Sequence, residues 1–281
     1  MKLSFLFYEP IPELGELDRR MARIAGLGYE GIELTASHPM PYPIEDVLAL
    51  TRKHRLPVVS LLSGWSYANE KLCLASSRSD VRQRAVDRLI EYTGHAARLG
   101  AVLVVGLMQG LRNDEADEAA ANPRIEACLR TVAYAAVERG TTVVLEPVNH
   151  LQVGFNNTAA EAAAMVERVA SPGLSYMLDT IHLNIEERSI LETIRCHGRL
   201  IRHFHLCETN GGPFGTGNLD FPSVLRTLAE IGYLHFVSVK IYRKASWEES
   251  AQGAMAFLRE ECQRHTTSST SEYKNVTPPV A

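Results

Sequence analysis

The chain has 281 residues, of which 46% are hydrophobic and 22% charged, with a formal net charge of −4 at pH 7. This length and composition indicate a globular protein with one large core, since α/β barrels commonly reach about 250 residues as one domain. The basic residues are scattered, the five cysteines show no paired spacing, and no leader-like or membrane-length apolar segment is present. We therefore expect a cytoplasmic protein with reduced thiols that contacts neither nucleic acid nor membrane.

Short apolar runs alternate with longer amphipathic ones, a pattern typical of βα units around a parallel sheet. Strands are predicted at residues 2–8, 31–34, 57–62, 102–106, 142–146, 174–178, 200–205 and 236–241. Each is followed by a helical stretch, and eight such units close most simply as a single (β/α)8 TIM barrel. The alternative is an open doubly wound sheet, but no glycine-rich phosphate loop follows the first strand.

The barrel is expected to occupy residues 1–264 as one domain. The last segment, 265–281, is rich in Ser, Thr and Pro and has no hydrophobic period. Such a composition buries too little apolar surface to fold, so we expect a disordered tail there.

Five predicted strands end in a polar residue: Glu33, Glu146, Asp179, His205 and Lys240. The C-terminal strand ends of a TIM barrel face the active site, so these residues are candidates for chemistry. Glu146, Asp179 and His205 follow consecutive strands and can converge on one point. Carboxylates with an imidazole suit Mn²⁺, Mg²⁺, Co²⁺ or Zn²⁺, so we predict a divalent-metal site at these residues. His203 is expected to face away from His205, as a buried or helix-facing residue.

Four motifs resemble those of the sugar phosphate isomerase and epimerase superfamily with a xylose isomerase-like barrel, and most closely those of ketose 3-epimerases. They are "LEPVNH" (145–150), "LDTIHLNIEE" (178–187), "HFHLCETNGGPFGTGNLDF" (203–221) and "IGYLHFVSVKIYR" (231–243). The resemblance covers residues 2–264. It implies a fold of this type, a small carbohydrate or cyclitol substrate, and a homo-oligomer.

The resemblance also implies roles for individual residues. Glu146 would be both a metal ligand and the proton-transferring base, and Asp179 and His205 would be ligands. His182 would bind substrate oxygens, and Glu33 would line the pocket. Independently of the resemblance, Trp65 is a candidate for a hydrophobic wall against a sugar ring.

Three positions depart from the ketose 3-epimerase pattern. Lys240 stands where the resemblance implies a fourth ligand, a glutamate that is also the second catalytic base. Gln152 stands in place of a substrate-binding glutamate, and Gly211 in place of an arginine. Two interpretations of Lys240 remain open: it acts as a general acid beside a metal with Glu146 as base, or its ammonium replaces the metal.

These patterns predict an isomerase or epimerase of carbohydrate metabolism that moves a proton next to the carbonyl of a small keto-sugar, inosose or sugar acid. One alternative is a dehydratase or lyase acting on a keto-sugar or inosose. Another is a non-catalytic carbohydrate-binding relative in which Lys240 has replaced the metal. The least favoured is an endonuclease for abasic DNA, because it needs a multi-metal cluster and a basic surface.

Overall fold

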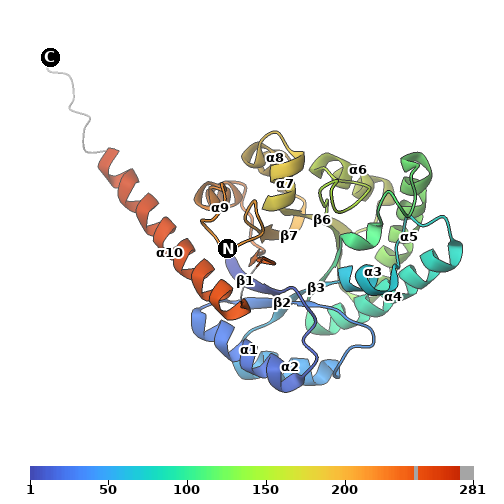
Figure 1. The fold of residues 1–281 in the computed structure, drawn as a ribbon, viewed down its shortest axis with the longest axis horizontal. Helices are drawn as coiled ribbons and strands as arrows, with labels where there is room; N and C mark the ends of the chain where they lie inside the picture. The colour runs from blue at the N-terminus through green and yellow to red at the C-terminus, as the bar shows by residue number, and fades with distance from the viewer. Residues whose placement is uncertain (244–245, 273–281) are drawn as a thin grey trace, which may run out of the picture.

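The computed structural model describes residues 1–243 and 246–272, and their side chains as far as residue 260. Eight parallel strands follow one another in sequence order and close into a barrel, with β1 paired to both β2 and β8 (Figure 1). They are β1 (Lys2–Phe7), β2 (Gly31–Thr35), β3 (Val58–Leu62), β4 (Val102–Val105), β5 (Val143–Leu145), β6 (Leu174–Asp179), β7 (Ile201–Leu206) and β8 (Phe236–Val239). Every predicted strand is present, and the prediction of a single TIM barrel is confirmed.

Helices surround the barrel on its outside (Figure 1). They are α1 (Leu14–Leu27), α2 (Ile44–His54), α3 (Gly64–Glu70), α4 (Ser79–Leu99), the 3-10 turn η1 (Leu107–Gln109), α5 (Glu118–Arg139), α6 (Ala159–Val169), α7 (Thr180–Glu186), α8 (Ile190–His197), α9 (Phe221–Glu230) and α10 (Trp247–Glu272). Gly100 ends α4 with φ of 68°, and its N–H bonds to carbonyls of the last turn. A residue without Cβ adopts this conformation at low cost, which lets the chain turn into β4.

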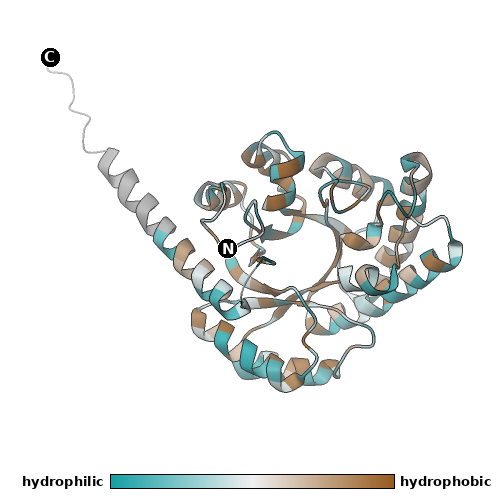
Figure 2. Ribbon diagram, in the orientation of Figure 1, coloured by the Kyte–Doolittle hydropathy of each residue, from teal (hydrophilic) through white to brown (hydrophobic). Residues whose placement is uncertain are grey.

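Most of the core lies between the strands and the helices, and a smaller apolar cluster of Val104, Val144 and Met177 is separate from it. In Figure 2, hydrophobic residues colour much of the strands, whereas the helices carry both hydrophilic and hydrophobic residues. Five polar side chains of strands β2, β3, β7 and β8 are nonetheless buried: Glu33, Ser60, His203, His205 and Ser238. Burying polar groups in a barrel is costly unless they have partners, so a cluster of such residues is a candidate for function.

The first part of the last helix, α10, packs against α1 and α9, with Ala251, Ala254, Met255 and Leu258 buried in the core, and its C-terminal part extends away from the barrel (Figure 1). It continues through residues 265–272, where the sequence predicts the start of a disordered tail. An established helix extends at low cost, because each further residue adds one hydrogen bond. The rest of the predicted tail, 273–281, lies outside the described residues. In the part of the chain that the structure describes, no helix has both the length and the apolar character needed to cross a bilayer.

Candidate active site

The five polar residues predicted at strand ends come together at the C-terminal end of the barrel. Glu33, Asp179 and His205 lie within β2, β6 and β7, whereas Glu146 and Lys240 directly follow β5 and β8. All five are buried, with at most 6% of their surface exposed. Charged residues are almost never this buried without partners, so their contacts determine what the site can do.

One group of contacts surrounds the ammonium of Lys240. Its Nζ donates a hydrogen bond to Asp179 Oδ2 at 2.7 Å and lies 3.4 Å from Glu146 Oε1. Burial disfavours the charged carboxylates, but the charge of Lys240 and nearby histidines outweigh it, lowering the pKa of Glu146 to about 2 and the pKa of Asp179 below its ordinary value. Burial would also lower the pKa of Lys240, but the two carboxylates raise it well above its ordinary value. All three groups are therefore charged near neutral pH.

His182, in α7, faces the same carboxylates. Its Nε2 lies 3.6 Å from Glu146 Oε1 and 3.9 Å from Asp179 Oδ2, while its Nδ1 lies 2.7 Å from Asn149 Nδ2. Asn149 Oδ1 accepts the backbone N–H of Leu151 at 3.1 Å, which turns the amide so that its NH2 group meets His182. An amide NH2 only donates, so His182 Nδ1 is the acceptor of this contact, and the N–H of the ring lies at Nε2, toward Glu146.

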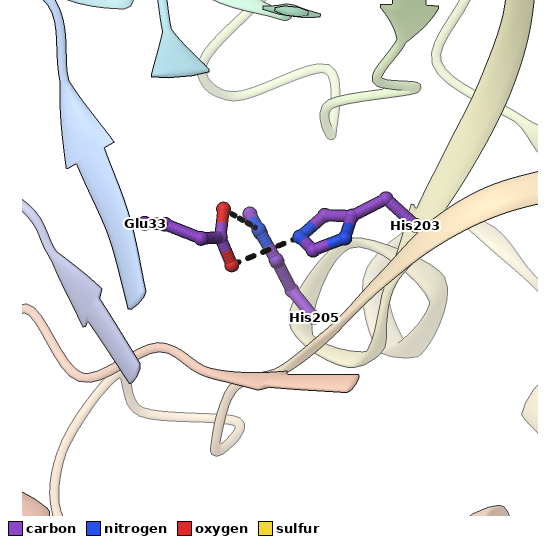
Figure 3. A group of neighbouring side chains, drawn as sticks. All are labelled: Glu33, His203 and His205. Atoms are coloured by element: carbon purple, nitrogen blue, oxygen red, sulfur yellow. Dashed lines mark hydrogen bonds and ion pairs between the residues drawn. The ribbon is translucent and has the colours of Figure 1, made fainter. Parts of the chain in front are cut away.

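A second group of contacts surrounds Glu33 (Figure 3). Its Oε1 lies 2.9 Å from His203 Nε2, and its Oε2 lies 3.1 Å from His205 Nε2. The hydroxyl of Ser60 donates another hydrogen bond to Glu33 Oε2. Burial would raise the pKa of Glu33, but the two histidines hold it well below its ordinary value. Glu33 is thus an ionised group enclosed by strands β3 and β7.

Two expectations about these residues differ from the structure. His203 does not face away from His205, because strand positions two apart share a face, and both rings lie beside Glu33 (Figure 3). Glu33 does not line the cavity described below, because its carboxylate is fully buried against the two histidines and Ser60. Glu33 therefore contacts the site through His205 and does not reach the cavity itself.

His205 connects the two groups of contacts. Its Nε2 faces Glu33, and its Nδ1 lies 3.4 Å from Asp179 Oδ2 and 3.7 Å from Glu146 Oε1. Burial opposes protonation, but Glu33 and Asp179 outweigh it and raise the pKa of His205 to about 10. The imidazolium form can direct an N–H toward a carboxylate on each side of the ring.

The described residues contain two sets of ligand-type atoms that lie within 4.8 Å of one another, namely Glu33, His203 and His205, and Glu146, Asp179 and His182. The predicted ligands Glu146, Asp179 and His205 do converge, but the ammonium of Lys240 lies among them and contacts the same carboxylate oxygens. A divalent ion would have to lie about 2.0–2.2 Å from those oxygens, in the space that the ammonium takes. This arrangement of side chains does not fit a divalent metal ion.

A cavity of about 140 Å³ opens beside this cluster. Five of the residues predicted to be catalytic or to bind substrate line it: Glu146, Lys240, His182, Gln152 and Trp65. Much of the remaining wall is apolar and is formed by Tyr8, Leu62, Ala68, Val104, Leu107 and Val148. A mostly apolar pocket with a few convergent polar groups is typical of small-molecule sites.

Gly211 stands where the resemblance implies an arginine, and an aromatic side chain packs against it. It lies in the loop after β7 with φ of 68°, and a Cβ built on it would overlap the ring of Tyr242. Tyr242 in turn packs against Tyr8, with 5.8 Å between ring centroids, and Tyr8 lines the cavity. An aromatic pair thus stands beside the site in place of a cationic side chain.

The sequence analysis missed Asn149 and Ser60, which contact the site, and placed His203 on the wrong face of its strand. Asn149 lies within the motif "LEPVNH", and this position is the signal that could have identified it. The i, i+2 spacing of "HFH" could have placed His203 next to His205. Ser60 lies in an ordinary apolar strand, and its sequence surroundings carry no comparable signal.

Comparison with known proteins agrees with this architecture. A family profile described as "Xylose isomerase-like TIM barrel" matches residues 21–261. The ketose 3-epimerase of Arthrobacter globiformis is 28% identical over 73% of this chain and 71% of its own length, and the L-ribulose 3-epimerase of Mesorhizobium japonicum is 32% identical over 66% and 63%. A solved structure of an L-ribulose 3-epimerase superposes with a TM-score of 0.82 at 24% identity, covering 99% of each chain. With a profile match across most of its length, this chain belongs to the family of xylose isomerase-like TIM barrels.

Proposed function

We propose that this protein is a sugar isomerase or epimerase that moves a proton next to the carbonyl group of a small keto-sugar. The observation that carries the proposal is the position of Glu146, a carboxylate that lines the cavity with Lys240 Nζ at 3.4 Å and His182 Nε2 at 3.6 Å. A base beside two hydrogen-bond donors is the combination that enolisation requires. The names of the relatives, which are sugar 3-epimerases, support the same class of reaction and offer no support for a lyase.

Glu146 is the proposed base. Its pKa is lowered to about 2, so the carboxylate is ionised at neutral pH and available to accept a proton from the carbon next to the carbonyl. The same shift makes it a weaker base than an ordinary glutamate, so the reaction depends on the donors that stabilise the oxyanion. The C–H electron pair then forms the carbon–carbon double bond, and negative charge develops on the former carbonyl oxygen. Return of the proton to the former carbonyl carbon gives isomerisation, provided that the hydroxyl proton on the neighbouring carbon moves to the former carbonyl oxygen and leaves a new carbonyl behind. Return of the proton to the opposite face of the same carbon gives epimerisation.

Lys240 and His182 are the proposed donors to the developing oxyanion. Both line the cavity, and the contact of Asn149 with His182 Nδ1 leaves the Nε2 proton free to point toward Glu146 and the substrate. Donors that are fixed before the reaction stabilise the enediolate without having to reorganise. Epimerisation needs a second proton-transferring group, and Lys240 is the cavity residue whose ammonium can supply one.

The charges around the cavity favour an uncharged substrate. Among the described residues that line it, the only lysine or arginine is Lys240, and its ammonium already contacts two carboxylates. Gly211 and Tyr242 stand where an arginine would bring a second cation. A keto-pentose, keto-hexose or inosose therefore fits better than a phosphorylated sugar or a sugar acid, which needs an unpaired cationic partner.

The test is proton exchange in deuterated water, followed by NMR on a panel of keto-sugars and inososes. We expect the wild type to exchange the proton next to the carbonyl of at least one substrate, and Glu146→Gln to lose about 100-fold or more of that rate. The matched control is Glu138→Gln, which alters an exposed glutamate of α5. Binding of a sugar without exchange in the wild type would instead favour the non-catalytic carbohydrate-binding alternative, and unchanged exchange in Glu146→Gln would remove the proposed base.

A further inference from the structure

The head group of Lys240 is the centre of the site. Lys240 follows β8, is 6% exposed, and places Nζ 2.7 Å from Asp179 Oδ2 and 3.4 Å from Glu146 Oε1. The same two oxygen atoms are those nearest to His205 Nδ1 and His182 Nε2. The two carboxylate oxygens and the two imidazole nitrogens that could bind a metal ion therefore all lie around the ammonium of Lys240.

Most of the carboxylate and imidazole atoms around the ammonium already have partners, so few of them are available to bind a metal ion. Asp179 Oδ1 accepts the backbone N–H of Ile181 at 3.0 Å, and Asp179 Oδ2 accepts from Lys240. His205 is held from its other side by Glu33 at 3.1 Å. A divalent ion would have to displace the ammonium or lie against it, with like charges in contact inside a buried site.

We propose that the ammonium of Lys240 is the permanent cation of this site and takes the place of a divalent metal ion, so that the protein catalyses proton transfer without a metal. This inference deepens the proposed function and rests on it for its catalytic part. The carboxylates of Glu146 and Asp179 together with one ammonium give a local charge of −1. Three carboxylates around a divalent ion would also sum to −1, so a lysine in place of one glutamate and the ion leaves the summed charge of the carboxylates and their cation unchanged, with the histidines not counted.

The ammonium supplies hydrogen bonding where a metal would supply Lewis acidity. Lys240 lines the cavity, so an N–H can point at the carbonyl oxygen of the substrate. As Glu146 removes the carbon-bound proton, this N–H stabilises the oxygen or transfers its proton to it, and the reverse transfer regenerates the ammonium. No electrons are gained or lost, so the step needs no further reactant.

Metal content tests the inference without any substrate. The wild type, Lys240→Glu and Lys53→Glu would be purified without chelator, incubated with excess Mn²⁺ or Co²⁺, desalted and subjected to elemental analysis. We expect far less than one ion per chain in the wild type, and one ion per chain in Lys240→Glu, where a third carboxylate faces Glu146, Asp179 and His205. Lys53→Glu is the matched control, because Lys53 also lies 2.7 Å from a carboxylate but is exposed, and it should gain no ion.

The wild-type measurement decides the inference even if Lys240→Glu does not fold. One tightly held ion per wild-type chain that Asp179→Asn removes would overturn it, as would an Mn²⁺-dependent rise in the unfolding temperature of the wild type that Asp179→Asn abolishes. The inference and the proposed function also fail separately. Exchange that requires added metal refutes the inference and keeps the function, whereas a metal-free protein without exchange on any substrate refutes the function and keeps the inference that the ammonium fills the cation position.

Discussion

Replacing Lys240 with methionine would remove the ammonium that contacts two buried carboxylates. Methionine has a similar length and no charge, so the change removes the contacts of 2.7 Å and 3.4 Å to Asp179 and Glu146 with little loss of volume. Unit charges at these separations attract by about 6 and 5 kcal/mol at an effective dielectric constant of about 20. Much of this attraction is offset by desolvation of the charges. Breaking a buried ion pair typically costs about 3 to 5 kcal/mol, so we expect the free energy of unfolding to fall by that amount.

The loss of stability in Lys240→Met should become smaller as the pH falls. In the wild type the pKa of Glu146 is about 2, below its value near 4.3 in the unfolded chain. Ionised Glu146 therefore contributes stability above the unfolded pKa, and this contribution fades as the pH falls toward 2. In Lys240→Met, burial without a cation raises the pKa values of both carboxyls, so protonation stabilises the folded variant. The difference between the two proteins should be largest near neutral pH and should shrink at about pH 4.

The assay is urea unfolding of the wild type, Lys240→Met and Lys53→Met near pH 7.5 and near pH 4. Lys53 is the control because its Nζ lies 2.7 Å from Asp18, the same distance as in the buried pair, but its side chain is 57% exposed. Water and salt screen an exposed pair, so Lys53→Met should change stability far less. If Lys240→Met is no less stable than Lys53→Met near pH 7.5, or if its deficit grows on acidification, the ammonium does not compensate the buried carboxylates.

Three further changes test the surroundings of the site. Asn149→Leu removes the hydrogen bond to Nδ1 that sets the His182 tautomer, which is worth about 1 kcal/mol. We therefore expect kcat to fall roughly fivefold with KM little changed. Gly211→Arg places a side chain against the Tyr242 ring at φ of 68°, so the unfolding temperature should fall, and Gly211→Arg combined with Tyr242→Ala should recover part of the loss. Glu208→Ala removes the acceptor of three backbone N–H groups in the loop after β7, and hydrogen exchange of those amides should speed up while the barrel strands stay protected.

The sequence alone was enough to predict the barrel. Each βα unit is encoded by neighbouring residues, as an apolar strand followed by an amphipathic helix, so its hydrophobic periodicity can be recognised in the sequence. The polar strand ends were also readable, because the topology of parallel strands brings their C-terminal ends to one side. For this reason Glu146, Asp179, His205 and Lys240 could be assigned to one site before their distances were known.

Only the tertiary structure decided how these residues pair. The flexible four-carbon chain of Lys240 can place its ammonium beside several neighbours, and the carboxylates of β5 and β6 determine that it lies between them. Glu33 likewise was expected to line the cavity, but it lies in the middle of β2, and its carboxylate meets His203 and His205 of β7 inside the barrel. Such contacts join residues more than 60 positions apart, as between Lys240 and Asp179. A sequence pattern specifies which face a side chain occupies, whereas the partner it finds there depends on the packing of strands that only the closed barrel brings together.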